Sequence, residues 1–394
     1  MNAVILAAGK STRTYPLTVN KPKSLLKVAN KHVIKYNLDA LKGLVKEVII
    51  VVGFCKDMIK AELGNEYEGM KIIYAEQEEQ LGTGHALLAA EPFVDERFFV
   101  MMGDDIYSKE DIRKLLMHRC AVSAKKVSDP SSFGIWIVEN GLVRGYEEKP
   151  ENPRSDLANP GLYVLTRDIF PHIRSLQKSP RGEYELNEAV NNLAKDIDIH
   201  CVEIEGWIPI GYPWDVLDAN EKILESHKGI VKGLIEEGVV IKGEVSIGMN
   251  TLVKSGSYIE GPVIIGDNCV IGPNCHIRPK TSIGNDCHIE FGVQIKNSVI
   301  GDGVNIKHLS YIGDSVIGDN VNIACGTITA NLRHDGNSVS SFVKGQKIDT
   351  KRRKFGTVIG EGAKTGIGTL IYPGRKIWPG KTTLPGEVVK DDIM

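Results

Sequence analysis

From Ile241 onward, an aliphatic residue recurs at every sixth position of the chain. The unbroken run comprises Ile241, Ile247, Val253, Ile259, Ile265, Ile271, Ile277, Ile283, Ile289 and Ile295. After two shifts in phase of a single residue, the series resumes at Ile300, Ile306, Ile312, Ile317 and Ile323, with a weaker echo at Ile359, Ile371 and Ile377. Only Val, Ser, Thr or Cys stands two residues before each position from Ile247 to Ile323, which suits a tight inward corner. This hexapeptide repeat predicts a parallel β-helix.

Glycine and cysteine usage follows from the same repeat. The chain has 41 glycines, which exceeds the usual share of about 7%. Glycine often follows the repeated aliphatic residue, where a turn between flat faces favours a residue without Cβ. Cys269, Cys275 and Cys287 take the small inward position and are expected to be packing residues. Because the seven cysteines include no C-x-x-C pair, neither a zinc site nor a disulfide framework is indicated.

The first 228 residues have a different pattern, in which short β-branched runs alternate with helical stretches. This alternation predicts a mainly parallel sheet covered by helices. We expect strands at 71–75, 98–104, 133–139, 142–148 and 161–166, and helices at 84–91, 109–118, 184–194 and 212–228. The predicted organisation is an α/β domain over 1–206, a linker with a connecting helix over 207–236, and a β-helix domain over 237–394.

Charge and hydropathy narrow the classes of partner. Forty-eight Lys and Arg against fifty Asp and Glu leave a net charge of -2, which gives no electrostatic case for nucleic acid or a membrane surface. No apolar run approaches the roughly 20 residues that a spanning helix needs, and no signal peptide is recognisable. We therefore expect a cytoplasmic protein.

The segment over 6–26 combines a strand end, a glycine turn and cations, as a triphosphate site requires. It is not a Walker A motif, because Val4 stands where another glycine is needed. The glycines at 82 and 84 lack the third glycine of a dinucleotide-binding fingerprint. Both generic phosphate motifs therefore fail on spacing.

The same segment, LAAGKSTRTYPLTVNKPKSLL, resembles the signature loop of the sugar-phosphate nucleotidylyltransferases. Further marks of that family follow in order: EQLGTGHAL (79–87), GDD (103–105), FG (133–134), EEKP (147–150) and NPGLY (159–163). The resemblance implies a nucleoside triphosphate, UTP or dTTP, and a sugar-1-phosphate as substrates. It also implies Mg²⁺ at Asp104, and a reaction in which a sugar phosphate oxygen attacks the α-phosphorus and pyrophosphate leaves.

Site residues of the first half are implied by that resemblance, position by position. Arg13 and Lys23 would act in catalysis by stabilising the phosphate charge. The nucleotide would be held by Leu6, Ala7, Ala8, Gly9, Thr12, Gln77, Gly82 and Thr83. The sugar phosphate would be held by Gly134, Glu148, Lys149 and Asn159. Many relatives carry a second metal-binding aspartate in a W-x-D-x-G stretch, but this chain has Pro209 there, and Asp215 is the alternative ligand.

Three cations interrupt the repeat of the second half at the turn position that glycine takes elsewhere: Arg278, Lys296 and Lys307. His308 follows Lys307, and the register of Ile306, Ser310 and Ile312 predicts that its side chain points outward. An outward histidine among cations suits deprotonation of a substrate amine beside an anionic phosphate.

The strings HIRP, VQIK, KHLSYIGD, DNVNIACGTIT and AN, between 276 and 331, resemble the acyltransferase half of the bacterial bifunctional uridylyltransferase/acetyltransferases. That resemblance implies His308 as the catalytic base and acetyl-CoA as co-substrate. The remaining implied residues are Arg278, Lys296, Tyr311, Asn322 and Asn331 at the amino sugar phosphate, and Cys325 and Thr365 near acetyl-CoA. It also implies a left-handed β-helix and a homotrimer with the acetyl site between subunits.

The match weakens after Asn331, where a polar insertion runs over 333–356. Its cation run KRRK (351–354) is interpreted as a solvated surface stretch rather than a site.

The expected protein is therefore a Rossmann-like nucleotidyltransferase domain followed by a left-handed parallel β-helix of hexapeptide repeats. We expect N-acetylation of glucosamine-1-phosphate and uridylyl transfer to N-acetylglucosamine-1-phosphate. Two alternatives stay open. One is a glucose-1-phosphate thymidylyl- or uridylyltransferase with a purely structural β-helix, and the other is a non-catalytic interaction protein like the translation-factor exchange subunits.

Overall fold

The computed structural model describes residues 1–394 and divides into two compact units. The N-terminal unit comprises residues 1–10, 21–25 and 33–209, and the C-terminal unit comprises 11–20, 26–32 and 210–394. Two short pieces of the N-terminal sequence thus belong to the C-terminal unit. None of the helices has the length and apolar character that crossing a membrane requires.

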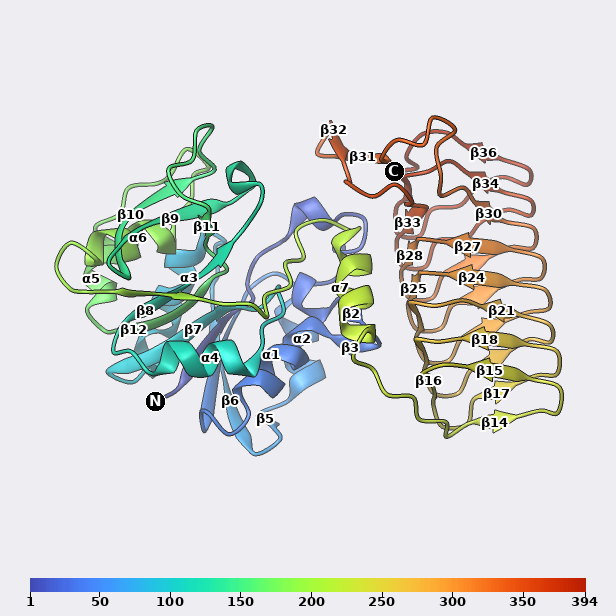
Figure 1. The fold of residues 1–394 in the computed structure, drawn as a ribbon, viewed down its shortest axis with the longest axis horizontal. Helices are drawn as coiled ribbons and strands as arrows, with labels where there is room; N and C mark the ends of the chain where they lie inside the picture. The colour runs from blue at the N-terminus through green and yellow to red at the C-terminus, as the bar shows by residue number, and fades with distance from the viewer. The chain divides into compact units, whose positions relative to one another are not determined.

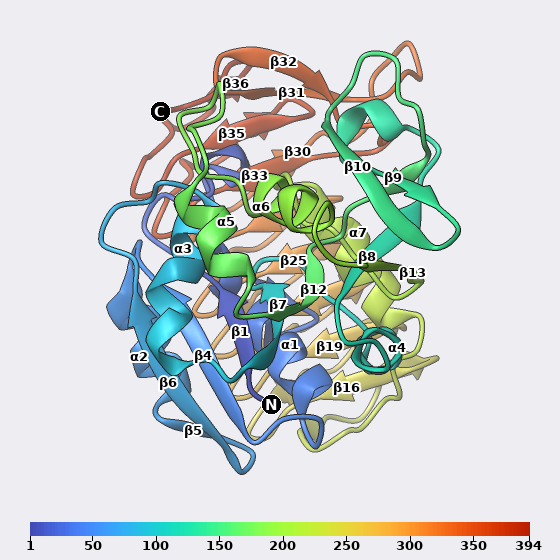
Figure 2. The ribbon, with the colours of Figure 1, turned by 90° about the vertical axis from the view of Figure 1, so that its left-hand side faces the viewer.

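An 11-stranded sheet forms the centre of the N-terminal unit. Its strands, in spatial order, are β11 (Leu157–Ala158), β9 (Gly134–Glu139), β10 (Leu142–Glu148), β13 (His200–Glu203), β8 (Ala121–Lys126), β12 (Leu162–Thr166), β7 (Arg97–Met102), β1 (Ala3–Leu6), β4 (Glu47–Val52), β6 (Met70–Glu76) and β5 (Glu66–Tyr67). Figure 2 shows β7, β1, β4 and β6 side by side, and these four are mutually parallel.

The expectation of a mainly parallel sheet is wrong for the sheet as a whole, because outside those four strands only β13 and β8 pair in parallel. β12 runs antiparallel between β7 and β8, and β10 pairs antiparallel with β9 and β13. For β9 and β10 the cause is local, because Asn140 and Gly141 join these two strands with positive φ angles of 53° and 77°. Such a two-residue turn reverses the chain into a hairpin.

Helices cover both faces of this sheet. On one face, α3 (Thr83–Ala90), α5 (Ile169–Arg174) and α6 (Leu186–Leu193) share a core with Val4, Leu6, Val51 and Val100. On the other face lie α1 (Val33–Leu41), α2 (Lys56–Leu63) and α4 (Lys109–Leu116). The four predicted helices each correspond to an observed one, whereas α2 and α5 were not predicted.

The C-terminal unit consists mainly of three parallel sheets whose strands alternate along the chain (Figure 1). The β14 sheet contains β14 (Leu234–Ile235), β17 (Leu252–Val253), β20 (Val270–Ile271), β23 (His288–Ile289), β26 (Asn305–Ile306) and β29 (Asn322–Ile323). The β15 sheet contains β15 (Val240–Lys242), β18 (Tyr258–Glu260), β21 (His276–Ile277), β24 (Gln294–Lys296), β27 (Tyr311–Gly313), β30 (Ile328–Thr329), β34 (Leu370–Ile371) and β36 (Val388–Val389). The β16 sheet contains β16 (Val245–Ile247), β19 (Val263–Ile265), β22 (Thr281–Ile283), β25 (Val299–Ile300), β28 (Val316–Ile317), β33 (Thr357–Ile359) and β35 (Arg375–Ile377).

From β14 to β33, each coil therefore contributes one strand to each sheet, as in a parallel β-helix. The repeated aliphatic residues stack in register, with Ile259 opposite Ile277, Ile277 opposite Ile295 and Ile295 opposite Ile312. These residues are fully buried, and Cys269, Cys275 and Cys287 lie beside them with at most 1% exposure. The cysteines are free thiols in a packed interior, as the repeat predicted.

Three additions complete the C-terminal unit. Strands β2 (Lys27–Val28) and β3 (Lys31–His32) form a small hairpin, and α7 (Asp215–Leu224) precedes the first coil. Within the insertion, β31 (Ser340–Val343) and β32 (Gln346–Asp349) form a second hairpin. After it the chain returns to the coils at β33.

Candidate active sites

Lys23 is a buried cation held between two carboxylates in the N-terminal unit. Its Nζ lies 2.9 Å from Asp104 Oδ2 and 3.6 Å from Asp105 Oδ1, and its side chain is 7% exposed. Asp104 follows β7, the parallel neighbour of β1, so both lie at the carboxyl edge of the parallel strands. Ligands of α/β sheets bind at this edge. A lysine fixed here is suited to meet a phosphate.

Asp104 is also the residue best suited to Mg²⁺ in this unit. Its side chain is 38% exposed, and only one carboxylate oxygen contacts Lys23. Mg²⁺ prefers carboxylate oxygens and keeps several of its waters, so one or two protein ligands suffice. No cluster of three or more His, Cys, Asp or Glu side chains arranged for a metal is present. The donor set therefore fits Mg²⁺ shared with a substrate phosphate.

Of the two positions considered for a second metal ligand, one has no donor atom in its side chain, and the other already accepts hydrogen bonds from the backbone. Pro209 has no ligating side chain. Asp215 begins α7, and its Oδ2 accepts hydrogen bonds from the backbone N–H groups of Gly211 (2.7 Å) and Tyr212 (2.8 Å). Trp207 donates from Nε1 to Asp105 Oδ2 at 2.9 Å. Asp105 is thus a second carboxylate beside Lys23, although the motif analysis assigned it no role.

The glycine loop after β1 is divided between the two units. Leu6, Ala7 and Ala8 are buried in the N-terminal unit, and a Cβ on Gly9 would meet no atom within 4 Å. Open space over Gly9 allows close approach of a ligand to the backbone. Thr12 and Arg13 begin a short helical turn that belongs to the C-terminal unit, where the Arg13 guanidinium lies 5.8 Å from the ring centre of Tyr212.

Gln77, Gly82 and Thr83 gather at the N-terminus of α3. Gln77 is 5% exposed, and its Nε2 donates to the carbonyl oxygen of Gly82 at 3.1 Å. Gly82 has a φ of 102°, and a Cβ there would lie 2.7 Å from the carbonyl oxygen of Tyr184. Thr83 Oγ1 accepts the backbone N–H of Leu186 at 3.0 Å. The three predicted base-binding residues therefore form one fixed surface.

The predicted sugar-binding residues Glu148 and Asn159 are joined through two side chains that the motifs did not reveal. Tyr146 donates to Glu148 Oε2 at 2.5 Å, and Asn187 donates from Nδ2 to Tyr146 Oη at 2.8 Å. Asn159 donates from Nδ2 to Asn187 Oδ1 at 2.8 Å. A Cβ on Gly134 would overlap the Tyr146 hydroxyl, so this glycine is sterically required.

Burial and the neighbouring Glu148 raise the pKa of Tyr146 well above its usual value, so the phenol stays a donor. Lys149, the remaining predicted residue of this group, adopts a φ of 45°, and its backbone N–H donates to the carbonyl oxygen of Phe133 at 3.1 Å. This bond extends the antiparallel pairing of β10 with β9 by one residue.

In the C-terminal unit, His308 is held by a carboxylate from the preceding coil. Its side chain is 54% exposed, whereas Ile306 and Ser310 are buried, as the repeat predicted. His308 Nδ1 lies 3.1 Å from Glu290 Oε2, and the His308 backbone N–H donates to the same oxygen at 3.3 Å. Lys307 donates from Nζ to Glu290 Oε1 at 2.8 Å.

Glu290 is a functional candidate that sequence reasoning missed. Hydrogen bonds from Lys307 and then His308 lower the pKa of Glu290 to about 2, although partial burial opposes the shift. The carboxylate is therefore ionised at any working pH and orients the ring so that Nε2 points away with a free lone pair. The sequence signal that could have revealed it is its position 18 residues before His308, which is one coil earlier.

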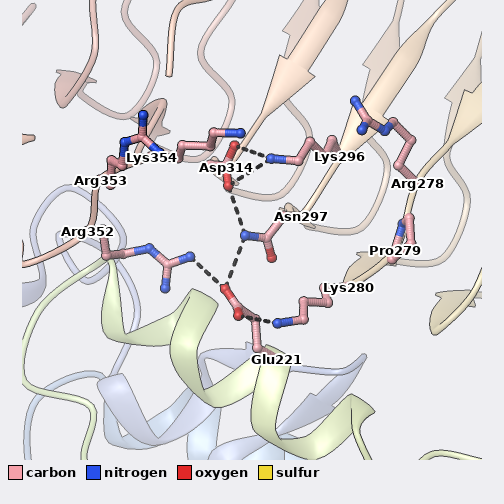
Figure 3. A pocket seen from close by; sticks show the side chains of 10 residues that line it. All are labelled: Glu221, Arg278, Pro279, Lys280, Lys296, Asn297, Asp314, Arg352, Arg353 and Lys354. Carbon is pink, nitrogen blue, oxygen red and sulfur yellow. Dashed lines mark hydrogen bonds and ion pairs between the residues drawn. The ribbon is translucent and has the colours of Figure 1, made fainter. Parts of the chain in front are cut away.

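A cavity of about 590 Å³ lies at the turns that connect the β15 sheet to the β16 sheet (Figure 3). It is lined by Glu221, Arg278, Pro279, Lys280, Lys296, Asn297, Asp314, Arg352, Arg353 and Lys354. Arg278, Arg353 and Lys354 have no carboxylate partner, whereas Lys280 and Arg352 are paired with Glu221. Three unpaired cations around one cavity suit a dianionic phosphate.

The interpretation of the KRRK run as a solvated surface stretch is wrong for Arg352, which is mostly buried and paired. Arg353 and Lys354 are exposed, but they line the cavity, and Arg352 has only 13% of its side chain exposed. The insertion returns to the coils through Phe355, whose backbone N–H donates to the carbonyl oxygen of Asn331 at 2.9 Å. This return places the cations over the cavity, and hexapeptide spacing could not predict it.

Asp314 gathers the predicted sugar phosphate residues on one edge of this cavity. It is 2% exposed, and it accepts hydrogen bonds from Lys296 Nζ at 3.1 Å and Asn331 Nδ2 at 2.5 Å. Asn331 Nδ2 also donates to Tyr311 Oη at 3.1 Å. Lys296, Tyr311 and Asn331 are thus brought together around a buried carboxylate, beside Arg278.

The other predicted residues lie elsewhere on the coils. His308 and Cys325 occupy stacked turns between the β14 and β15 sheets, and the N–H of Gly326 donates to the carbonyl oxygen of His308 at 3.1 Å. Asn322 lies on β29 in the β14 sheet. Thr365 is buried, with its hydroxyl accepting the Ala324 N–H at 2.9 Å, so its side chain lies inside the coil. One chain therefore does not bring all these residues together.

The two halves of the chain match two different protein families. The nucleotidyl transferase family matches residues 2–226, and the GMPPB C-terminal domain family matches residues 259–383. A bifunctional protein GlmU of Methanococcus maripaludis is 42% identical to the chain and aligns with 100% of it and 95% of the relative. A bifunctional sugar-1-phosphate nucleotidylyltransferase/acetyltransferase of Sulfurisphaera tokodaii is 38% identical, with 100% of the chain and 98% of the relative aligned.

Among solved structures, a candidate glucose-1-phosphate thymidylyltransferase from Bacillus anthracis superimposes with a TM-score of 0.51 and 29% identity. The match covers 56% of this chain and 94% of that protein. Similarity to that structure thus accounts for only part of the chain, whereas the bifunctional relatives match its whole length.

The His308–Glu290 contact predicts a fixed imidazole tautomer. With the chain labelled with ¹⁵N at histidine, we expect the NMR signals of His308 at high pH to show Nδ1 protonated and Nε2 bare. In Glu290→Ala the ring loses its acceptor and should shift toward the Nε2–H form. Lys307→Met, which leaves Glu290 in place, is the matched control and should keep the Nδ1–H form. An identical tautomer in all three proteins would contradict the assignment of Glu290 as the orienting group.

Proposed function

Because the chain belongs to the family of bifunctional GlmU proteins, which match it over its full length, we propose that it is a bifunctional enzyme of UDP-N-acetylglucosamine synthesis. The C-terminal unit transfers the acetyl group of acetyl-CoA to the amine of glucosamine-1-phosphate. The N-terminal unit then transfers a uridylyl group from UTP to N-acetylglucosamine-1-phosphate and releases pyrophosphate. We further propose that the enzyme acts in the cytoplasm.

One observation carries the acetyltransferase half of the proposal: the exposed His308 with its Nδ1 on the ionised Glu290 (3.1 Å). A β-helix that served only as scaffold would have no need of an oriented, solvent-facing imidazole. The same pair argues against a monofunctional nucleotidyltransferase. The buried Lys23 between Asp104 and Asp105 argues against a non-catalytic interaction protein, because it fits a phosphate site.

In acetyl transfer, the amine nitrogen of the sugar bonds to the thioester carbonyl carbon, and the carbon–sulfur bond breaks. His308 Nε2 takes the proton that the amine gives up and returns it to the leaving sulfur, so coenzyme A departs as the thiol. Glu290 stabilises the imidazolium that forms between these steps. We assign the contact with acetyl-CoA to Cys325, whose turn stacks on that of His308, and not to Thr365, whose side chain is buried.

The phosphate of the amino sugar is assigned to the cavity over Arg278, Arg353 and Lys354. Lys296 adds a fourth cation, which Asp314 holds in place, and Tyr311 and Asn331 meet the sugar hydroxyls. Arginine and lysine recognise phosphate through charge-assisted hydrogen bonds, which are stronger than neutral ones.

In uridylyl transfer, the chain positions two anionic substrates and supplies no nucleophile. Lys23, and Arg13 from the divided loop, offset the charge that builds up at the α-phosphate. Gln77 and Thr83 orient the base, and Glu148 and Asn159 bind the sugar. Mg²⁺ at Asp104, when bound, neutralises phosphate charge and aligns the triphosphate.

The acetyl site is completed between subunits of a homotrimer. His308 and the cation cavity lie at two different corners of the coils, so a partner copy is needed to bring acetyl-CoA, base and sugar phosphate together. Leu309, next to His308, is 60% exposed, and Ile328, Leu370 and Val388 are exposed in one row of the β15 sheet. Exposed apolar rows of this kind mark an interface. We further propose that the coils wind left-handed.

The substrate assignment predicts which combinations react. With glucosamine-1-phosphate and acetyl-CoA, the protein should release free thiol, and with N-acetylglucosamine-1-phosphate and UTP it should release pyrophosphate. His308→Ala should lose at least about 100-fold in thiol release, because a general base contributes 10²–10⁴-fold, and keep pyrophosphate release. Asp104→Ala should lose pyrophosphate release and keep thiol release. Equal loss of both activities in either variant would contradict the assignment to separate sites, and dTTP with glucose-1-phosphate as the best pair would favour the thymidylyltransferase alternative.

The trimer proposal predicts a mass of three chains by light scattering in solution. Leu309→Asp places a charge in the interface and should dissociate the assembly and abolish acetyl transfer, while uridylyl transfer continues. Met117→Asp, which changes a 79% exposed apolar residue of the N-terminal unit, is the control and should remain trimeric. A monomeric wild-type protein with full acetyl transfer would contradict the shared site.

A further inference from the structure

Helix α7, which connects the two halves of the sequence, forms one wall of the cation cavity. The helix is anchored to the coils through Asn220, which is completely buried. Asn220 donates to the carbonyl oxygen of Lys280 at 2.9 Å and accepts a hydrogen bond from Ser282 Oγ at 2.9 Å. This anchoring fixes the face of α7 that carries the neighbouring Glu221.

Glu221 makes three contacts inside the cavity, all with protein donors (Figure 3). Its carboxylate lies 2.6 Å from Arg352 Nη2, 2.8 Å from Lys280 Nζ and 3.1 Å from Asn297 Nδ2. Burial by itself would raise the pKa of Glu221, but the hydrogen bonds from Lys280 and Arg352 outweigh it and lower the pKa below its usual value. The group is therefore a fixed anion. Because an anion repels phosphate, its place in this cavity requires a reason other than contact with the substrate.

The contact with Arg352 supplies that reason. Arg352 is bound by Glu221 through one nitrogen and by Asp218, one turn earlier on α7, through the other. The next two residues are Arg353 and Lys354, the cations that line the cavity without a partner. After them, Phe355 is buried, with its ring edge against Trp214 at 5.9 Å between ring centres. The cation segment is therefore held on both sides, at Arg352 and at Phe355.

Glu221 is also joined to the opposite side of the cavity. Asn297 Nδ2, besides contacting Glu221, lies 2.9 Å from Asp314 Oδ1. Asp314 in turn holds Lys296 and Asn331, as described above. A continuous set of hydrogen bonds thus runs from Arg352 through Glu221, Asn297 and Asp314. It ends at Lys296 and Asn331, which were predicted to bind the sugar phosphate.

We propose that Glu221 is a positioning residue for acetyl transfer, which holds Arg352 so that Arg353 and Lys354 face the phosphate of the amino sugar. The connecting helix is then part of the acetyltransferase site and not only a tether. This inference rests on the proposed function, because it assumes that the cavity binds the sugar phosphate. It assigns the residue no contact with the substrate.

The test compares phosphorylated and unphosphorylated substrate. Glu221→Gln keeps the size of the side chain and removes its charge. With the full-length protein, the KM for glucosamine-1-phosphate should rise about tenfold, since small displacements of binding groups have effects of this order or larger. The kcat and the KM for acetyl-CoA should stay within about twofold. We expect acetylation of glucosamine, which has no phosphate, to be slow and to have the same rate in wild type and Glu221→Gln. General damage to the fold would instead lower the rates with glucosamine and with glucosamine-1-phosphate.

Two further variants sharpen the result. Arg352→Gln removes the other end of the contact and should raise the same KM. The double variant should be no worse than the weaker single one, because both act through one contact. Glu225→Gln is the matched control, since Glu225 directly follows the last residue of α7, is exposed and has Lys222 as its only ion-pair partner, at 3.4 Å. It should behave as wild type.

The outcomes separate this inference from the proposed function. If wild-type protein acetylates glucosamine-1-phosphate and Glu221→Gln leaves its KM unchanged or lowers it, the positioning role is wrong and the acetyltransferase assignment stands. A fully additive double variant would also overturn the positioning role. If wild-type protein acetylates no amino sugar phosphate, the proposed function is wrong, and the inference falls with it.

Discussion

The hexapeptide register is the constraint on which the C-terminal unit depends. Each coil must place an aliphatic residue inside in register with its neighbours, and the stack from Ile259 through Ile312 keeps this register across one change of coil length. Strand positions are therefore committed to packing, and only turns and outward faces can carry chemistry. His308 lies at a turn, and Arg278 and Lys296 directly precede turns. The insertion that brings Arg353 and Lys354 enters where a turn was extended.

A second feature of the molecule is that a carboxylate holds basic side chains in place at each proposed binding site of the C-terminal unit. Glu290 orients His308, Asp314 holds Lys296 and Asn331, and Glu221 holds Arg352. The chain is nearly neutral, with a net charge of -2, so its phosphate sites arise from local imbalance. Arg278, Arg353 and Lys354 are left without partners at the place where a phosphate is expected. In the N-terminal unit, Lys23 is instead held by Asp104 and Asp105.

Much of the fold could be predicted from the sequence, because it depends on patterns that repeat over short stretches of the chain. A six-residue repeat predicted the coils and the outward direction of His308, and the alternation of strands and helices predicted the layered N-terminal unit. The positioning carboxylates could not be predicted in this way. Glu290, Asp314 and Glu221 each resemble a solvated surface charge in sequence, and their partners come from another coil or from the insertion. The prediction of a mainly parallel sheet was wrong in part because a hairpin at Asn140 and Gly141 makes β9 and β10 antiparallel, a reversal that the alternation of strands and helices does not indicate.

The central claim is that one chain carries two independent active sites that act in sequence on the same sugar phosphate. The most direct measurement supplies acetyl-labelled acetyl-CoA, glucosamine-1-phosphate and UTP together and follows the label into nucleotide sugar. We expect acetyl-labelled UDP-N-acetylglucosamine from the wild-type protein, none from His308→Ala or Asp104→Ala alone, and renewed formation when the two variants are mixed. A nucleotide sugar that never carries the acetyl label would contradict the account.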